Sequence, residues 1–282
     1  MEKLVEKWMP SKDSSFIVKE YLILPNSAMY MRTHDEYEIT VITRGSGKRF
    51  IGNTIENFIE GDIFILGPHV PHSVQIDENQ EGHAITIHFL KSAFGSGFFD
   101  IPENSHIKEF LHYSQLGLTL KSKNQGLVEK IKNLTNKNGY SRMLYFFDLL
   151  NEIANRKDKK VVSSRGFTKI SNNKDYVSVN KTYEYIIKRF ENQSISLIEI
   201  SDHLNMSPST FCRFFKKHFK KTYTKFINEV RIGHSCKLLQ ETNKNIAQVA
   251  FASGYNHLTH FNKQFKKIMK CSPREYKREL NR

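Results

Sequence analysis

Two stretches of the sequence carry the same residue types at the same spacing. One is "FCRFFKKHFKKTYTKF", from Phe211 to Phe226, and the other is "FNKQFKKIMKCSPREY", from Phe261 to Tyr276. In each stretch, a helix would place two phenylalanines on one side and long cations with hydroxyl or amide groups on the other. Lysine and arginine bind phosphate oxygens, whereas arginine and asparagine can each form two hydrogen bonds with a base edge. The pattern therefore indicates double-stranded DNA as a partner.

The polar sides of these two helices supply the candidate contacts. A helical wheel directs the phenylalanines inward and exposes Ser209, Cys212, Arg213, Lys216, Thr259, Asn262, Lys263 and Lys266. Lysines at the end of each stretch are candidate phosphate contacts, namely Lys216, Lys217, Lys266 and Lys267. The alternative is a solvent-exposed helix face above phenylalanines that serve only the core. Two matching copies in the basic part of the chain make this alternative less favoured than a single copy would.

Each of these helices follows a shorter helix and a tight turn, so the sequence predicts two helix-turn-helix motifs, at 197–219 and 246–269. Asn205 and Gly254 suit the left-handed turn positions. A connecting helix at 223–240 would span about 27 Å, close enough to the roughly 34 Å between successive major grooves for both motifs to bind one duplex. The helices expected are 180–192, 197–204, 208–219, 223–240, 246–253, 257–269 and 273–280.

Charge is concentrated in the same part of the chain. The whole chain has 43 Lys and Arg against 29 Asp and Glu, and nearly all of the excess follows Arg165. Such asymmetry predicts a polyanionic partner for the C-terminal part, although a basic surface without a partner is the alternative. No apolar run is long enough for a membrane span, the N-terminus lacks a secretory signal, and the three cysteines are not at metal-ligand spacing. We therefore expect a cytoplasmic protein that does not bind membranes.

The N-terminal half has the pattern of an all-β domain. Short segments rich in β-branched and aromatic residues predict strands at 37–45, 48–53, 62–68, 72–76 and 83–90. A helical pattern follows to about residue 155, and 161–180 is polar and predicted to be a linker. The expected organisation is therefore an all-β barrel with following helices (1–160), the linker (161–180) and an all-α domain (181–282).

From about Thr182 to Leu280 the chain resembles the DNA-binding domain of AraC/XylS-type transcriptional regulators. The stretches that carry the resemblance are "SLIEISDHLNMSPSTFCRFFKKHF", "FINEVRIGHSCKLLQETNKNIAQVAFASGY" and "FNKQFKKIMKCSPREYK". The resemblance implies groove-facing residues at Ser209, Cys212, Arg213, Leu258, Thr259, Asn262 and Lys263. Asn205 replaces a usual glycine, Leu258 a polar residue and Lys263 a common arginine, and a lysine lacks the planar guanidinium that pairs with guanine through two donors. By family habit, the resemblance also implies RNA polymerase as a partner and an activating role.

Over roughly 20–95 the chain resembles the cupin-type effector domain of many such regulators, through "HDEYEITVITRGSGKRFIGN" and "EGDIFILGPHVPHSV". A small barrel can hold one small-molecule effector. The residues expected in its pocket are His34, Tyr37, Glu38, His72 and His88. Metal-binding cupins have a His-x-His pair where this chain has Arg32-x-His34, so we expect neither a metal nor another cofactor.

The helices at 126–155 either form a homodimer surface or pack their apolar face on the barrel, and both alternatives stay open. The most favoured function is a sequence-specific DNA-binding transcription regulator, an activator without enzymatic activity, that responds to a small-molecule effector. A cupin metalloenzyme with an accessory nucleic-acid-binding domain is the alternative from another class. A ligand-independent architectural DNA-binding protein is a third.

Overall fold

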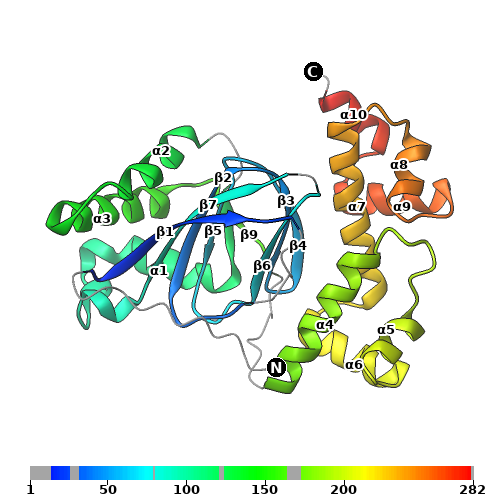
Figure 1. Cartoon of the computed structure of the whole chain (residues 1–282), viewed down its shortest axis with the longest axis horizontal. Helices are drawn as coiled ribbons and strands as arrows, with labels where there is room; N and C mark the ends of the chain where they lie inside the picture. Colours follow the sequence, from blue (N-terminus) through cyan, green and yellow to red (C-terminus); the bar gives the residue numbers. More distant parts are fainter. Residues whose placement is uncertain (1–13, 26–31, 79, 121–123, 164–172, 281–282) are drawn as a thin grey trace. The chain divides into compact units, whose positions relative to one another are not determined.

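The computed structural model describes residues 14–25, 32–78, 80–120, 124–163 and 173–280 of the 282-residue chain. The chain divides into two compact units, with the boundary between Lys169 and Ile170 (Figure 1). This boundary falls in the predicted linker 161–180, of which 164–172 lie outside the described residues. Each unit has its own secondary structure and its own core.

The first unit contains two β-sheets. The larger sheet is antiparallel throughout, in the order β1 (Phe16–Ile23), β7 (Gly82–Phe89), β2 (Tyr37–Arg44), β5 (Ile63–Leu66), β8 (Leu118–Leu120) and β9 (Lys160–Val161). The smaller sheet has the order β4 (Thr54–Phe58), β3 (Gly47–Ile51) and β6 (His72–Ile76). The five predicted strands are confirmed as β2, β3, β5, β6 and β7, whereas β1, β4, β8 and β9 were not predicted.

Helices follow the strands in this unit. They are α1 (Ser105–Tyr113), α2 (Gln125–Leu134) and α3 (Gly139–Asn155), with short 3-10 turns at Lys91–Phe94, Phe98–Asp100, Pro102–Asn104 and Ser114–Leu116. Figure 1 shows α1, α2 and α3 gathered on one side of the strands. Leu127 and Ile131 of α2 and Phe146 and Leu150 of α3 are at most 1% exposed, in one hydrophobic cluster with the larger sheet. Packing on the barrel, one of the two alternatives for 126–155, is therefore observed.

Alternation along the strands gives the larger sheet two different faces. Because successive side chains point to opposite faces, odd-numbered residues of β2 such as Ile39 and Val41 pack with the helices. Ile42 at the end of β2 instead packs with Phe58 and Ile51 of the smaller sheet. The space between the two sheets is therefore lined by the same face of β2 that carries Glu38 and Thr40.

The second unit is helical. Its helices are α4 (Asn173–Arg189), α5 (Leu197–His203), α6 (Pro208–Phe219), α7 (Tyr223–Glu241), α8 (Ile246–Ala252), α9 (Leu258–Met269) and α10 (Pro273–Leu280). These elements match the predicted helices closely, except that α4 begins at Asn173 rather than 180. The linker prediction was wrong over this segment. Asp175 in the first turn favours a helix N-terminus, and Val179 and Tyr183 are buried on one face of α4.

The two halves of this unit repeat one local design. α5 and α8 each begin with a capping box, formed by Ser196 with Glu199 and by Asn245 with Gln248. α6 and α9 each have 12 residues, and each ends at a lysine with positive φ, Lys220 at 55° and Lys270 at 66°. The internal duplication inferred from the sequence therefore extends to the caps at both ends of each motif.

Helix α7 belongs to the cores of both halves. Near its start, the Phe226 ring packs edge-on against Phe215 and Phe219 of α6. Further along, Ile232 and Cys236 join α8 and α9 in a second hydrophobic cluster. One helix thus forms a wall for each helix-turn-helix motif.

Candidate nucleic-acid interface and ligand pocket

Helix α6 presents a polar, basic surface over an aromatic core. Phe211 and Phe215 are fully buried and Phe219 is 1% exposed, which fixes the face that α6 turns inward. Ser207 caps the helix through its hydroxyl, which accepts a hydrogen bond from the Thr210 amide, and Pro208 occupies the first turn. All the predicted contact residues on α6 are exposed, namely Ser209, Cys212, Arg213, Lys216 and Lys217.

Helix α9 repeats the buried phenylalanines and the exposed basic face of α6, but His257 at its N-cap makes no side-chain capping hydrogen bond. Phe261 and Phe265 are fully buried. The predicted contact residues are again all exposed, namely Leu258, Thr259, Asn262, Lys263, Lys266 and Lys267. Leu258, at the first position of the helix, is 38% exposed, so an apolar side chain is available there beside the polar ones.

Residues outside the predicted set share these surfaces. Thr210 and His260 are exposed at equivalent positions in the first turn of α6 and α9, and Lys220 and Lys270 are exposed at the two C-caps. The same wheel arithmetic that selected Arg213 places Thr210 on the exposed side, so the sequence contained this signal.

The two basic surfaces are not equivalent in their ion pairs. Lys217 Nζ lies 2.9 Å from Asp175 Oδ2 of α4, and His218 Nε2 lies 3.0 Å from the same oxygen. At the equivalent position of α9, Lys267 has no carboxylate within ion-pairing distance among the residues that the structure describes. The Asp175 carboxylate therefore balances part of the positive charge of Lys217.

Arg231 of α7 has a structural position that the sequence did not predict. Its Nε donates to the Phe190 carbonyl and a terminal nitrogen donates to the Asn192 carbonyl, both at 2.8 Å. Its guanidinium also lies over the Tyr255 ring, 5.6 Å from the centroid. Arg231 therefore joins the end of α4 to the second motif.

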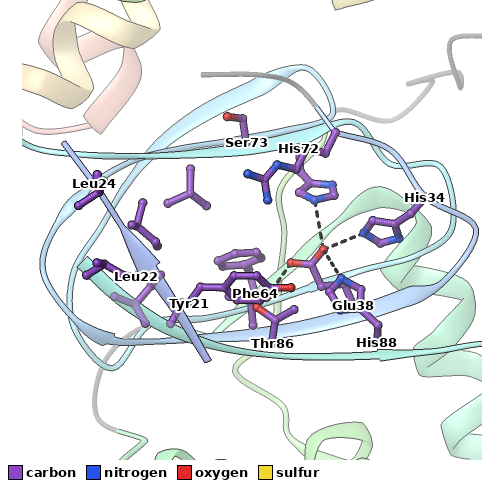
Figure 2. A pocket seen from close by; sticks show the side chains of 16 residues that line it. Tyr21, Leu22, Leu24, His34, Glu38, Phe64, His72, Ser73, Thr86 and His88 are labelled. Atoms are coloured by element: carbon purple, nitrogen blue, oxygen red, sulfur yellow. Dashed lines mark hydrogen bonds and ion pairs between the residues drawn. The ribbon is translucent and has the colours of Figure 1, made fainter. Parts of the chain in front are cut away.

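In the first unit, a cavity of about 220 Å³ lies between strands of both sheets (Figure 2). Figure 2 shows a polar end, where His34, Glu38, His72 and His88 converge, and an opposite end with Leu22 and Leu24. The remaining lining residues are Tyr21, Ile23, Arg32, Thr40, Ile42, Phe64, Ser73, Val74, Ala84 and Thr86. The cavity thus suits a small molecule with one polar end and one apolar end.

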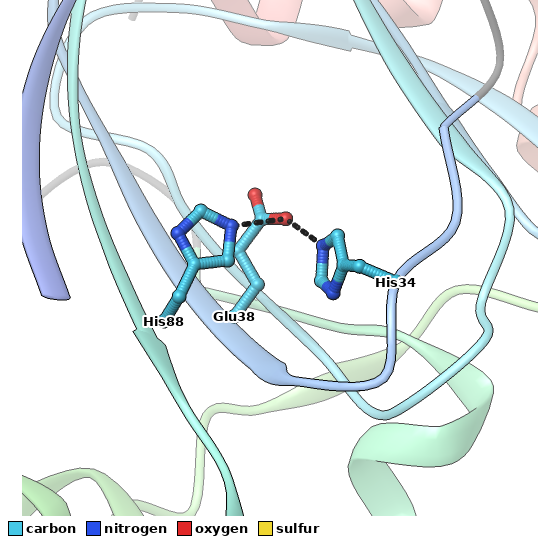
Figure 3. A group of neighbouring side chains, drawn as sticks. All are labelled: His34, Glu38 and His88. Carbon is cyan, nitrogen blue, oxygen red and sulfur yellow. Dashed lines mark hydrogen bonds and ion pairs between the residues drawn. The ribbon is translucent and has the colours of Figure 1, made fainter. Parts of the chain in front are cut away.

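The polar end is built around one carboxylate oxygen. Glu38 Oε2 lies 2.9 Å from His34 Nε2, 3.1 Å from His72 Nε2 and 3.5 Å from His88 Nε2 (Figure 3 draws two of these contacts). His88 lies directly opposite Glu38 in the β2–β7 register. The other oxygen, Oε1, accepts a hydrogen bond of 2.6 Å from the Thr40 hydroxyl. Four of the five predicted pocket residues are therefore brought together.

Electrostatics favour charge in this cluster. Burial disfavours the Glu38 carboxylate, but His72, His34 and His88 outweigh it and hold the pKa of Glu38 well below its usual range. Burial also disfavours a proton on His34, yet the hydrogen bond and the charge of Glu38 raise the pKa of His34. The cluster therefore holds an ionised carboxylate in a site that is almost closed to solvent.

Tyr37 is not part of the pocket, and its prediction is corrected. It precedes Glu38 on β2, so its side chain points to the opposite face, where it stacks on Phe89 in the core beneath the helices. Thr40 and Thr86, which share the face of Glu38, line the pocket but were not predicted. Side chains alternate between the two faces of a strand, and this alternation was the sequence signal that could have placed Thr40, rather than Tyr37, in the predicted pocket.

Models of known protein families match parts of both units. Residues 20–120 match the model of the AraC-like ligand binding domain, and residues 200–279 match the model of a helix-turn-helix domain. The chain therefore belongs to the AraC-type transcriptional regulators, with a ligand-binding domain followed by a DNA-binding domain.

Similar proteins span nearly the whole chain. It is 24% identical over 281 residues to the HTH-type transcriptional activator RhaR of Mannheimia succiniciproducens, covering 95% of each chain. It is 25% identical over 247 residues to the Msm operon regulatory protein of Streptococcus mutans, covering 87% of this chain and 85% of that one. The crystal structure of ToxT from Vibrio cholerae O395 is 16% identical, with a TM-score of 0.37, and covers 94% of this chain and 98% of that one. Within the described residues, no helix has the length and apolar character needed to cross a membrane.

Proposed function

We propose that this regulator binds a specific DNA site with both helix-turn-helix motifs and activates transcription in response to a small molecule held between its β-sheets. The observation that supports it most is the repeated exposed surface on α6 and α9, each over a fully buried phenylalanine pair. Activation is proposed by analogy with the relative RhaR, which is named a transcriptional activator. RNA polymerase is the partner that this role requires.

Arg213 and Asn262 are the proposed base-contacting residues of the two motifs. Arginine suits guanine and asparagine suits adenine in the major groove. α7, with 19 residues, spans about 28 Å and shares a core with each motif, which supports binding in consecutive major grooves. Each motif should therefore determine its own cluster of base pairs, about 10 base pairs from the other.

Selection of bound sequences from randomised duplexes tests this proposal on the full-length protein. Arg213→Ala should cost about 1–3 kcal/mol on the selected site and little on random DNA, with lost preference at one cluster. Asn262→Ala should do the same at the other cluster. Lys188→Ala, which removes a cation of α4 that pairs with Glu184, is the matched control and should leave the selected sequence unchanged. Loss of preference at the same base pairs in both variants would contradict the two-groove arrangement.

The proposed effector is a small molecule with a polar head and a short apolar body. Its head would meet the His34, Glu38 and His88 end of the cavity, and its body would contact side chains such as Leu22 and Phe64. A homodimer through 126–155 is also proposed, because Tyr140 and Leu144 of α3 are 70% and 50% exposed beside the face that packs on the sheet. Sedimentation equilibrium of the full-length protein tests the dimer, with Leu144→Asp as the disrupting variant.

A metalloenzyme is the second candidate function, favoured by the imidazole and carboxylate groups in the cavity. The two functions differ in what a change in the cavity should alter. In a regulator, Thr86→Val at the wall of the cavity should alter transcription from a reporter promoter while DNA binding by the second unit is retained. A chemical conversion that this variant abolishes, without any change in transcription, would favour the enzyme.

A further inference from the structure

The orientation of two histidine rings fixes where their protons lie. His34 Nδ1 lies 3.0 Å from the Glu36 carbonyl, and His72 Nδ1 lies 3.0 Å from the Val70 carbonyl. A carbonyl oxygen can only accept a hydrogen bond, so each Nδ1 must carry the proton. In a neutral ring, the lone pair then sits on Nε2.

Both of these lone pairs would point at a hydrogen-bond acceptor. His34 Nε2 and His72 Nε2 are 2.9 Å and 3.1 Å from Glu38 Oε2, where a single carboxyl proton could satisfy only one of the two lone pairs. His88 Nε2 approaches the same oxygen from β7, at 3.5 Å. Several lone pairs directed at one carboxylate oxygen repel each other unless a positive charge lies among them.

We propose that His34, Glu38 and His88 bind a divalent first-row transition metal, with His72 as an adjacent fourth ligand. The ligand atoms of His34, Glu38 and His88 all lie within 4.8 Å of one another, and all three residues are buried. Imidazole nitrogens with one carboxylate oxygen suit zinc, iron or nickel rather than magnesium or calcium. The sequence did not predict a metal because Arg32 stands where metal-binding cupins have the first histidine of a His-x-His pair, and His88 supplies an imidazole from strand β7 instead.

The surroundings of the cluster are those of a metal site. Metal-binding histidines usually donate their second ring nitrogen to a carbonyl, as His34 and His72 do here. Metal-binding carboxylates are usually held by a further hydrogen bond, which Thr40 provides to Glu38. Because the ligands line the cavity, the metal would border the space proposed for the effector.

Protons are the competing source of positive charge. The Glu36 carboxylate lies 3.6 Å from His34 Nδ1, so a proton on His34 would have a partner on each side of the ring. A proton can bridge only two of the groups that meet at Glu38 Oε2, whereas a divalent cation can accept a lone pair from each imidazole and from the carboxylate at once.

Direct metal binding to the full-length protein tests the proposal. After dialysis against a chelator, titration with Zn²⁺ should give one site per chain by calorimetry, and Co²⁺ should give the visible absorption of a nitrogen- and oxygen-bound ion. His88→Ala and Glu38→Gln should each weaken binding at least about 10-fold, as loss of metal-site groups does. His83→Ala is the matched control, because His83 lies on the same strand but on the opposite face from His88.

Two measurements keep the test independent of folding and of the proposed function. Zn²⁺ should raise the melting temperature of the parent chain and of His83→Ala but not of His88→Ala, because only the folded site binds it. Binding below one equivalent, or equal binding by His88→Ala and His83→Ala, would overturn the metal site. A regulatory role of the metal rests on the proposed function. It is supported if Zn²⁺ changes the affinity for the operator at least about 3-fold in the parent chain but not in His88→Ala. It is overturned if the metal-loaded parent chain binds DNA with unchanged affinity.

Discussion

Lys217 and Lys267 occupy equivalent positions on α6 and α9, yet their surroundings differ. Lys217 pairs with Asp175, whereas Lys267 has no such acid among the described residues. Lys267→Ala should therefore weaken binding to all sequences alike and make the log–log salt slope less steep by about 0.9, the contribution of one phosphate contact. Lys217→Ala should have a smaller effect on both. Fluorescence anisotropy across a salt series measures the slopes, and equal slopes for the two variants would contradict the role given to Asp175.

The stacked rings of Phe215 and Phe219 form part of the core beneath α6. The Phe215 ring stacks on Phe219 with centroids 4.0 Å apart and is fully buried. Phe215→Ala should lower the free energy of unfolding by about 3–5 kcal/mol because it leaves a cavity. Phe251→Ala, at a 48% exposed position of α8, should change it by less than about 0.5 kcal/mol. Urea unfolding measures both, and unchanged stability with lost DNA binding in Phe215→Ala would mean that the ring contacts DNA.

At the scale of elements, the turns inside the two motifs differ in the space around their left-handed residue. Asn205 and Gly254 both have positive φ, 54° and 84°. A Cβ at Gly254 would lie 2.6 Å from the Phe190 carbonyl oxygen and 2.8 Å from Arg231 Nε, whereas Asn205 already carries a Cβ. Gly254→Ala should therefore destabilise the second unit by more than the 1–3 kcal/mol typical of a strained backbone. Asn205→Ala, the matched change, should cost about 1 kcal/mol.

Thermal unfolding of both variants, with DNA binding as a second readout, checks this prediction. Equal destabilisation would show that Phe190 and Arg231 can move away from the turn without cost. Gly254→Ala also adds the cost of about 1–2 kcal/mol for a Cβ in the left-handed conformation, which Asn205 already carries, so only the loss beyond that cost reports the contacts with Phe190 and Arg231.

How far the sequence predicts the elements depends on where their signals lie. α5, α6, α8 and α9 have local caps and a regular apolar period, so their bounds could be predicted within a residue or two. β1 could not, because Lys19 and Glu20 interrupt its apolar pattern and its pairing partner β7 is far along the chain. The start of α4 was missed because its first three residues are polar, whereas the apolar residues that are buried, such as Val179 and Tyr183, come later in the helix.

The two candidate sites could be predicted to different degrees, because one depends on local periodicity and the other on contacts between residues far apart in the sequence. The exposed residues of α6 and α9 follow from helical periodicity alone. His34, Glu38, His72 and His88 were chosen by residue type, but their convergence on one oxygen depends on strand register and on long-range pairing that the sequence does not display. Tyr37 was wrong because residue type was given more weight than the alternation of the strand.

At the scale of the whole molecule, the division of charge coincides with the division into two units. The boundary between Lys169 and Ile170 separates a nearly neutral part from one that carries most of the excess of Lys and Arg. The fragment from Ile170 to Arg282 should therefore fold and bind DNA without the first unit, because its helices have their own core. Circular dichroism and anisotropy at low salt measure this. A folded fragment that does not bind DNA would contradict the assignment of DNA binding to this unit.

The two motifs share their core phenylalanines and a pair of exposed lysines, and they differ in other residues that face outward. Phe211 and Phe215 recur as Phe261 and Phe265, while Cys212 and Arg213 are replaced by Asn262 and Lys263. A single chain with two unlike motifs would place different side chains in the two major grooves. The two halves of its operator should therefore be unrelated in sequence. Such a site has a direction, and reversing it beside a promoter would reverse the order of the two motifs along the DNA.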